Sequence, residues 1–470
     1  MLQLLLGGSG SGKTTLLYQR IRARAEKGEK SILLVPEQFT SSTEGRIYRE
    51  LGDALSGMVE SFSFTSLAEK ILSTEGGAAV QTLSDAGRAV LVRRALEELQ
   101  DNVHYYHRHR RSAAFCQMAA QTIDELKSAG LSGQQLAQLA GACGAESGKL
   151  SELALIFQGY ETLLARSGMD PSDRLELAGA RLEEALARHS LPEFLRNRAV
   201  FIDEFDTFNA PKKRLLGAML AALPSVTVAL CDDGAPLLPG DLSLFSGAKQ
   251  VAAQLRQLAR KNGAEVAVPQ LLRKDLRHRN APGLAAVAEL LETGSCTADA
   301  PAGEVRLFAA PSREEEARAA AGAIRRLMRQ GVRCGKIAVV CRDIAKYRAA
   351  VRYEFRMAEI PLYCDEPTTP EFSAPATAVR ALLEIARGAD LTENLTTLAK
   401  TGLCALSEEQ VCALENYAYT WAPTAAAWRE KFERSPKGFG EQELTEEDLR
   451  NRERAEHARA LLVGAVDAFR

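Results

Sequence analysis

The stretch with the clearest chemical potential is "LLLGGSGSGKTTLL" (4–17), near the start of the chain. In it, Gly7, Gly12, Lys13 and Thr14 match the pattern G-x-x-x-x-G-K-[ST], between an apolar run and an expected helix. Glycine lets backbone N–H groups curl around phosphate oxygens, and the N-terminus of a helix adds partial positive charge. This context favours a phosphate-binding loop over the alternative of a glycine-rich turn without a ligand.

Each residue of this loop has an expected role. We expect Lys13 to reach the β- and γ-phosphates of ATP, where it would act in catalysis, and the Thr14 hydroxyl to ligate Mg²⁺. The expected nucleotide-binding residues are Gly8, Ser9, Gly10, Ser11, Gly12, Lys13, Thr14 and Thr15.

A pair of carboxylates follows a second apolar run, in "AVFIDEF" (199–205). We expect Asp203 at the end of this strand to hold Mg²⁺, and Glu204 to act in catalysis by polarising the attacking water. The alternative is that both acids only cap the strand in solvent. Asp206 is ambiguous, because it could serve the site or cap the next turn.

Three further charged residues follow apolar runs elsewhere in the chain. Asp232 and Asp233 in "CDDGAP" suit a sensor of the γ-phosphate, with a plain acidic loop as the alternative. Arg342 follows "KIAVVC" (336–341), and we predict that it stabilises transition-state charge across a cleft. The alternative for Arg342 is a surface salt bridge.

Two basic stretches could contact nucleic acid. "HYYHRHRR" (104–111) mixes histidine, tyrosine and arginine, which suits phosphates and stacking bases, and "LLRKDLRHRN" (271–280) is a second basic run. The alternative for each is a solvated helix face or loop.

Composition limits the class of protein. The 470 residues are 46% hydrophobic and carry a net charge of −2, so any nucleic-acid binding depends on local patches. The nine cysteines include no C-x-x-C pair, which indicates reduced thiols and argues against a cysteine-ligated metal or iron–sulfur site within these residues. No apolar run approaches the roughly 18 residues of a membrane span. We therefore expect a cytoplasmic protein that has no membrane partner.

Alternating strand and helix signals predict an α/β fold with a parallel sheet. We expect strands in 2–6, 30–39, 198–208 and 225–234, and a strand, a turn and then a helix in 59–72. Helical N-caps are expected at Ser84 and Ser151. The predicted domains are a split first α/β domain (1–75 and 191–290), a helical insertion (76–190), the start of a second α/β domain (303–375) and a helical region (376–470). In the second domain, 303–331 and 336–355 each read as a strand followed by a helix. The chain stops within an amphipathic helix, and we expect it to be the N-terminal part of a longer protein.

With these residues in view, the whole chain resembles the N-terminal part of the AddB family, subunits of bacterial AddAB (RexAB-like) helicase–nucleases. These proteins are related to the superfamily 1 helicases that include UvrD and RecB. The resemblance rests on the order of several segments: the phosphate loop, "LLVPEQFT", "VESFSFTSLAEKIL", "LSDAGRAVLVRRAL", "TIDELKSAGLSGQQL" and "PSREEEARAAAGAIRRLMRQGVRCGKIAVVCRD".

The resemblance implies a P-loop NTPase (RecA-like) domain with a helical insertion, followed by part of a second RecA-like domain with its own insertion. It implies processing of double-strand DNA ends for recombination, with ATP and Mg²⁺ as cofactors. It also implies an AddA-like motor partner in a heterodimer, and scanning of single-stranded DNA for a hotspot. DNA would contact the loops after "LLVPEQ" and "SFSFTS". A nuclease domain with an iron–sulfur cluster is expected only beyond these residues.

Two departures from the true motors leave alternatives open. The motors carry a glutamine-bearing adenine motif upstream of the phosphate loop, which is not expected here, and "CDDGAP" lacks the glutamine that follows their paired aspartates. The chain is then either a working ATPase, as the intact Asp203–Glu204 pair favours, or a DNA-binding module without ATPase activity. A third alternative is an unrelated P-loop ATPase.

Overall fold

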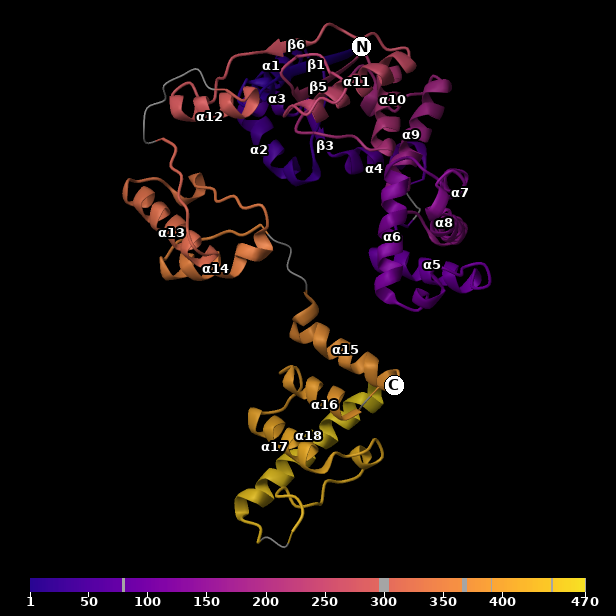
Figure 1. Ribbon diagram of the computed structural model, residues 1–470, viewed down its shortest axis with the longest axis vertical. Helices are drawn as coiled ribbons and strands as arrows, with labels where there is room; N and C mark the ends of the chain where they lie inside the picture. Colours follow the sequence, from indigo (N-terminus) through magenta and orange to yellow (C-terminus); the bar gives the residue numbers. More distant parts are fainter. Residues whose placement is uncertain (78–80, 296–303, 366–369, 390, 441–442, 470) are drawn as a thin grey trace. The chain divides into compact units, whose positions relative to one another are not determined.

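The computed structural model describes residues 1–77, 81–295, 304–365, 370–389, 391–440 and 443–469. The chain divides into two compact units, Met1–Leu307 and Phe308–Arg470 (Figure 1). Each unit has hydrophobic clusters of its own. In the described ranges, no helix has both the length and the apolar character that a membrane span requires.

The first unit is built on one parallel sheet with the strand order β3-β2-β4-β5-β1-β6. The strands are β1 (Leu2–Gly7), β2 (Ser31–Leu34), β3 (Val59–Phe62), β4 (Ala199–Ile202), β5 (Ser225–Cys231) and β6 (Gln270–Leu272). The α/β fold with a parallel sheet is thus as the sequence predicts. β6 pairs with β1 at the edge of the sheet and was not predicted, because three residues give no periodicity.

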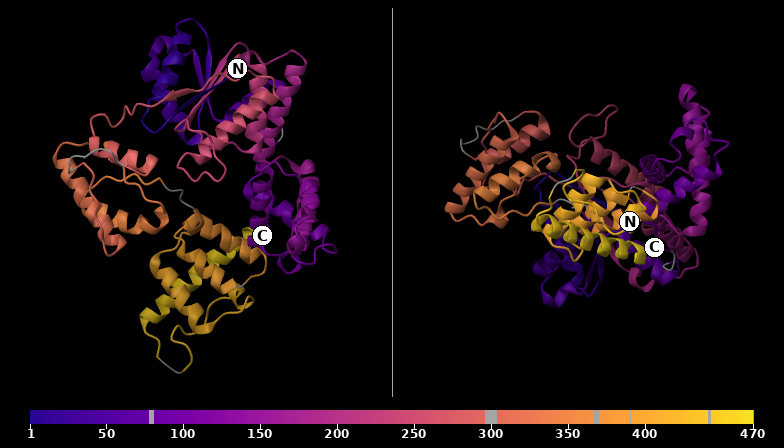
Figure 2. Two further views of the ribbon diagram at one scale, coloured as in Figure 1. Left: turned by 45° about the horizontal axis from the view of Figure 1, so that its top comes forward. Right: turned by 90° about the horizontal axis from the view of Figure 1, so that it is seen from below.

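Alternate residues of each strand enter different cores, as the pleat of a sheet requires. Leu4 and Ile32 pack into one cluster with α4 (Phe64–Glu75), α9 (Pro171–Ala187), α10 (Ala210–Ala222) and α11 (Ser246–Lys261). Their neighbours Leu5 and Leu33 pack into the other cluster with α1 (Lys13–Ala25), α2 (Thr40–Leu51) and the residues near α3 (Asp53–Ser56). Helices therefore cover both faces (Figure 2), which explains why β1, β2, β4 and β5 are mostly apolar. α12 (Pro282–Thr293) follows β6.

Four helices form an insertion between α4 and α9. They are α5 (Asp85–Glu98), α6 (Ala113–Ser128), α7 (Gly133–Ala140) and α8 (Ser147–Ser167), and they share a separate core. Ser84 caps α5 as predicted, since its hydroxyl accepts a hydrogen bond from the N–H of Gly87. The predicted cap at Ser151 is wrong, because α8 begins one turn earlier and Ser151 lies inside it.

The chain enters and leaves this insertion at one point. Thr82 and Met169 form an isolated parallel bridge, in which the N–H of Met169 donates to the carbonyl of Gln81 at 3.1 Å. The N–H of Leu83 donates in turn to the carbonyl of Met169 at 3.0 Å. The insertion is therefore connected to the rest of the first unit through two adjacent, hydrogen-bonded segments.

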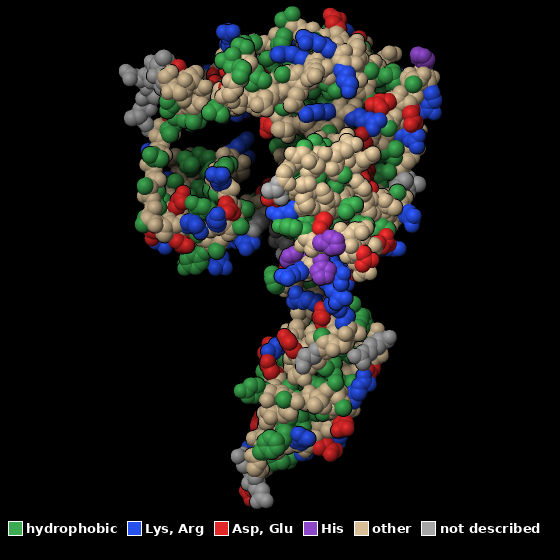
Figure 3. Space-filling model, turned by 45° about the vertical axis from the view of Figure 1, so that its right-hand side comes forward, with side chains coloured by type: hydrophobic (Ala, Val, Ile, Leu, Met, Phe, Trp, Pro, Cys, Tyr) green, Lys and Arg blue, Asp and Glu red, His purple; other side chains and the backbone are tan. Residues whose placement is uncertain are grey.

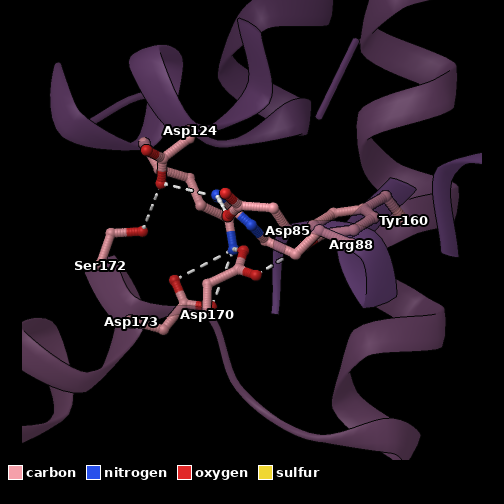
Figure 4. A network of polar contacts seen from close by, with 8 residues as sticks. Asp85, Arg88, Asp124, Tyr160, Asp170, Ser172 and Asp173 are labelled. Atoms are coloured by element: carbon pink, nitrogen blue, oxygen red, sulfur yellow. Dashed lines mark hydrogen bonds and ion pairs between the residues drawn. The ribbon is translucent and has the colours of Figure 1, made fainter. Parts of the chain in front are cut away.

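A network of charged side chains, buried at Lys127 and Asp170, lies beside this entry point (Figure 4). The ammonium of Lys127 on α6 lies 2.7 Å from the carboxylate of Asp170 and 2.8 Å from that of Asp173, at the start of α9. Tyr160 on α8 donates a hydrogen bond to Asp170 at 2.6 Å, and burial raises the pKa of its phenol. Arg88 on α5 pairs with Asp85 and Asp124. The network ties α5, α6 and α8 to the start of α9.

The second unit is helical in its described residues. Its helices are α13 (Arg313–Arg329), α14 (Ile344–Met357), α15 (Ala374–Ala386), α16 (Leu391–Lys400), α17 (Glu408–Trp421) and α18 (Glu446–Phe469). Helices α13 and α14 share one cluster, and α15 to α18 share another.

The prediction of strands before α13 and α14 is wrong. The described residues of these segments are 304–312 and 336–341. Neither segment forms a strand, and Leu307 and Val340 are almost fully exposed. A β-strand needs a neighbour for its backbone N–H and C=O groups, and in the described residues neither segment pairs with a strand. The sequence pattern is present, but the partner for pairing is not.

Candidate nucleotide site

The phosphate loop connects β1, which ends at Gly7, with α1, which begins at Lys13. Gly12 stands at the N-cap with φ 90°, in the left-handed region that favours glycine. A Cβ at this position would also lie 3.0 Å from the Cδ1 atom of Leu276. The local conformation thus explains why a glycine precedes Lys13.

The Lys13 side chain turns back over the loop. Its ammonium donates hydrogen bonds to the carbonyl oxygens of Gly7 and Gly8, each at 2.8 Å. Beside it, the Ser11 hydroxyl is buried and has no hydrogen-bond partner in the described part of the chain. A positive charge and an unsatisfied donor therefore lie together in the loop.

The carboxylates follow β4, the neighbour of both β2 and β5. The N–H of Asp203 donates to the carbonyl of Leu34 at 3.1 Å, which extends the pairing of β4 with β2 by one residue. Burial raises the pKa of Asp203, and the repulsion of Glu204 adds to this effect. A hydrogen bond from Thr14 and the charge of Lys13 act in the opposite direction. Asp203 is thus in contact with the first turn of α1.

Glu204 adopts an uncommon backbone conformation. Its φ is +66°, which costs a residue with a Cβ on the order of 1 kcal/mol. Its N–H donates to the Asp203 carboxylate at 3.0 Å, while its own side chain is exposed. The turn therefore buries Asp203 and presents Glu204 to solvent at adjacent positions.

These residues line one cavity of about 500 Å³. It is formed by Ser9, Gly10, Gly12, Lys13, Thr14, Thr15, Arg46, Asp203, Glu204, Phe205, Asp206, Ala229, Cys231, Leu276 and Arg277. The predicted residues of the loop and of the carboxylate pair thus meet beyond the carboxyl ends of β1 and β4. Gly8 and Ser11 belong to the loop but not to the lining. Asp206, which was ambiguous, faces the cavity.

Two arginines in this lining were not predicted. Arg46 comes from α2, and its guanidinium lies 5.0 Å from the ring centre of Tyr18. Arg277 comes from the segment after β6, and it donates to the Ser9 hydroxyl at 3.2 Å. The sequence did show Arg277 within the basic stretch 271–280, but the two interpretations of that stretch were a nucleic-acid contact and a solvated helix face or loop, and neither places it at the nucleotide site.

The segment around Arg277 lies against the phosphate loop. The N–H of Leu276 donates to the carbonyl of Gly10 at 3.0 Å, and Asp275 accepts hydrogen bonds from the backbone N–H groups of Arg277 and His278, each at 3.0 Å. Asp275 thus closes the turn that holds Arg277 over the loop.

Asp232 and Asp233 do not line this cavity. Asp232 accepts a hydrogen bond from the N–H of Gly234 at 2.7 Å, and Asp233 accepts one from Ala235 at 2.8 Å and lies 3.3 Å from the Lys249 ammonium. Cys231, one residue earlier, is the part of this strand end that lines the cavity. The two aspartates therefore stabilise a turn, which was the alternative interpretation.

Arg342 belongs to the second unit. It is exposed, in the segment that precedes α14. Its catalytic role stays a prediction.

The comparisons with known proteins identify the family. The family model "ADDB, N-terminal" matches residues 4–288. The chain is also similar to proteins named as the B subunits of ATP-dependent helicase/deoxyribonucleases. That of Desulforudis audaxviator is 32% identical over 91% of this chain, and that of Symbiobacterium thermophilum is 31% identical over 92%. That of Clostridium perfringens is 27% identical over the whole chain.

The chain spans 37% to 41% of the length of these three relatives. The family match covers the sheet, the insertion and the residues of the cavity. Since this match extends over more than half of the chain, the protein belongs to the AddB N-terminal family.

Proposed function

We propose that the first unit binds ATP with Mg²⁺ in a RecA-like P-loop domain. It would be the motor-like N-terminal part of a cytoplasmic helicase/deoxyribonuclease component that processes double-strand DNA ends for recombination. The named relatives support this role. Single-stranded DNA as a ligand for hotspot scanning and an AddA-like motor as heterodimer partner belong to the same proposal. Its nuclease and iron–sulfur cluster would be contributed by residues outside these 470.

The observation that carries the proposal is that the phosphate loop and Asp203–Glu204 line the same cavity. Lys13 would bind the β- and γ-phosphates, and Arg277 would add a second positive charge at the same place. The Thr14 hydroxyl and the Asp203 carboxylate offer the oxygen ligands that suit Mg²⁺. Glu204, exposed beside them, would orient and polarise a water molecule.

A second candidate function is a module that holds nucleotide without hydrolysis and serves DNA binding. Gly234 follows the paired aspartates, has φ +76°, and would bring a Cβ within 2.7 Å of the Leu271 side chain. A larger residue such as glutamine would therefore be strained at this position. The segment after β5 therefore forms a turn at the position where the motors have a side chain that senses the γ-phosphate.

Nucleotide binding tests the proposal directly. Titration of the 470-residue chain with a fluorescent ATP analogue and Mg²⁺ should give saturable binding, which Lys13→Ala weakens by at least about ten-fold. Lys27→Ala is the matched control, because Lys27 is exposed just beyond the end of α1 and lies outside the cavity. Equal binding by all three proteins would contradict the phosphate site.

Hydrolysis separates the two candidates. ATPase activity measured with single-stranded DNA, with and without the motor partner, should fall in Glu204→Gln while nucleotide binding is kept. If the unaltered chain binds the analogue but hydrolyses no ATP under any of these conditions, the second candidate is the correct one.

A further inference from the structure

The loop at residues 104–111, "HYYHRHRR", is a charged surface outside the nucleotide cavity. It joins α5 to α6 in the insertion and contains only one short 3₁₀ turn, His107–His109. Arg108 and Arg111 are exposed, as are all three histidines. Histidine and basic side chains gather on the helical insertion in Figure 3. The predicted basic stretch is therefore an exposed loop and not a helix face.

A carboxylate holds this loop from beneath. Glu152 on α8 accepts hydrogen bonds from three consecutive backbone N–H groups, those of His104 at 2.8 Å, Tyr105 at 2.7 Å and Tyr106 at 3.1 Å. The Tyr106 ring packs against Phe115, with 5.2 Å between the ring centres. Backbone and aromatic contacts thus fix the start of the loop, and Tyr106 has a structural role.

Acidic side chains neutralise arginines elsewhere on the insertion but not here. Arg93 and Arg94 on α5 each pair with a glutamate one turn later, Glu97 and Glu98, at 3.1 Å. Within the described residues, Arg108 and Arg111 make no ion pair. Glu152, whose carboxylate contacts the start of the loop, accepts hydrogen bonds from backbone N–H groups there. In the described residues, Arg108 and Arg111 therefore present positive charge without an ion-pair partner, on a chain whose net charge is −2.

We propose that the loop at 104–111, in the conformation set by Glu152, binds the phosphate backbone of nucleic acid. Arginine matches phosphate oxygens with paired N–H donors, and closely spaced arginines suit a regularly spaced polyanion. Tyr105 is 56% exposed and adds an aromatic group at the edge of the loop, while the Lys149 ammonium, 5.3 Å from its ring centre, pairs with Glu146 at 3.0 Å. The choice of nucleic acid as the polyanion rests on the proposed function.

The affinity for DNA and its salt dependence test this surface. The probe is a fluorescently labelled duplex with a single-stranded tail, measured by anisotropy over a series of salt concentrations without nucleotide. Arg108→Gln/Arg110→Gln/Arg111→Gln should bind about ten-fold more weakly, and the slope of log K against log[salt] should be shallower by about 2 to 3. Arg93→Gln/Arg94→Gln removes neutralised charges from the same insertion and should change neither quantity.

The role of the loop conformation needs a separate variant. Glu152→Gln removes a negative charge near the loop, so net charge alone would strengthen DNA binding. If the Glu152 hydrogen bonds set the loop conformation, their weakening should reduce DNA binding instead. If Glu152→Gln binds DNA as tightly as the unaltered chain, or more tightly, the preordered loop is not the binding element.

Two other outcomes decide the identity of the partner. Unchanged DNA binding and salt slope in the triple arginine variant would overturn the proposal. Unchanged DNA binding with lost binding to poly-glutamate would overturn it in favour of an acidic protein partner. Each variant should bind the ATP analogue as tightly as the unaltered chain does. A result that contradicts the proposed DNA-binding loop can therefore be told apart from one that contradicts the nucleotide site.

Discussion

Arg277 donates a hydrogen bond to the Ser9 hydroxyl across 3.2 Å, although 268 positions separate the two residues in the chain. The contact places a guanidinium at the phosphate loop from the opposite end of the first unit's sequence. If Arg277 binds the γ-phosphate, Arg277→Ala should weaken ATP binding by about ten-fold or more and ADP binding much less. Titration with fluorescent ATP and ADP analogues measures both affinities.

The control for this change is Arg279→Ala. Arg279 is exposed in the same segment but does not line the cavity. Its substitution should leave both affinities within about two-fold of the unaltered chain. Equal losses for ATP and ADP in Arg277→Ala would show that Arg277 does not act at the γ-phosphate.

Asp203 should oppose stability in the absence of metal. Its carboxylate is buried, so the charged form lacks solvation, and Asp203→Asn should raise the free energy of unfolding at pH 7. The same change should remove the part of the nucleotide affinity that depends on Mg²⁺. Urea unfolding and titrations with and without Mg²⁺ give the two quantities.

The pH dependence of the Asp203 effect has a defined sign. The pKa of Asp203 is raised in the folded state, so its charge penalises folding above that pKa, and the penalty disappears as pH falls through it. The stability advantage of Asp203→Asn should therefore shrink between neutral and acidic pH. An advantage that grew on acidification would contradict the burial of a charged Asp203.

Lys127 should be essential to the attachment of the helical insertion. Its side chain is 9% exposed, and Lys127→Met would leave the carboxylates of Asp170 and Asp173 without their cation. The expected loss in the free energy of unfolding is about 3–5 kcal/mol. Arg93→Gln breaks an exposed pair and should cost less than about 1 kcal/mol. Similar losses in the two variants would show that the buried network is not stabilising.

The two serines predicted as helix caps should differ in their effect on stability. Ser84→Ala removes a hydrogen bond to the N–H of Gly87 and should cost about 1 kcal/mol. Ser151→Ala lies inside α8 and should change the free energy of unfolding by less than about 0.5 kcal/mol. Thermal or urea unfolding of the two variants makes the comparison, and equal costs would contradict the capping geometry.

The sequence was sufficient where the geometry is local. The phosphate loop occupies consecutive residues, so its glycines, Lys13 and the start of the helix can be recognised from one short stretch of sequence. Asp203 and Glu204 were found because they end an apolar run that must be a buried strand. Their approach to Thr14 follows from the parallel sheet, in which the carboxyl ends of all strands lie at one edge.

Contacts that depend on distant pairing were not accessible. Arg277 reaches Ser9 only because β6 pairs with β1, with Leu271 opposite Leu6, and no local pattern specifies that register. The prediction of strands before α13 and α14 was wrong for a related reason. Apolar residues such as Val340 indicate strand propensity, but pairing requires a neighbour that the segment itself does not contain.

The parallel bridge of Thr82 and Met169 makes the insertion a module in the evolutionary sense. The chain departs from the α/β unit and returns to it at nearly the same place, and the intervening helices have their own core. Such a segment can lengthen, shorten or change its surface without shifting the register of any strand. Changes in the surface of the insertion can therefore accumulate independently of the residues that line the cavity beside Lys13.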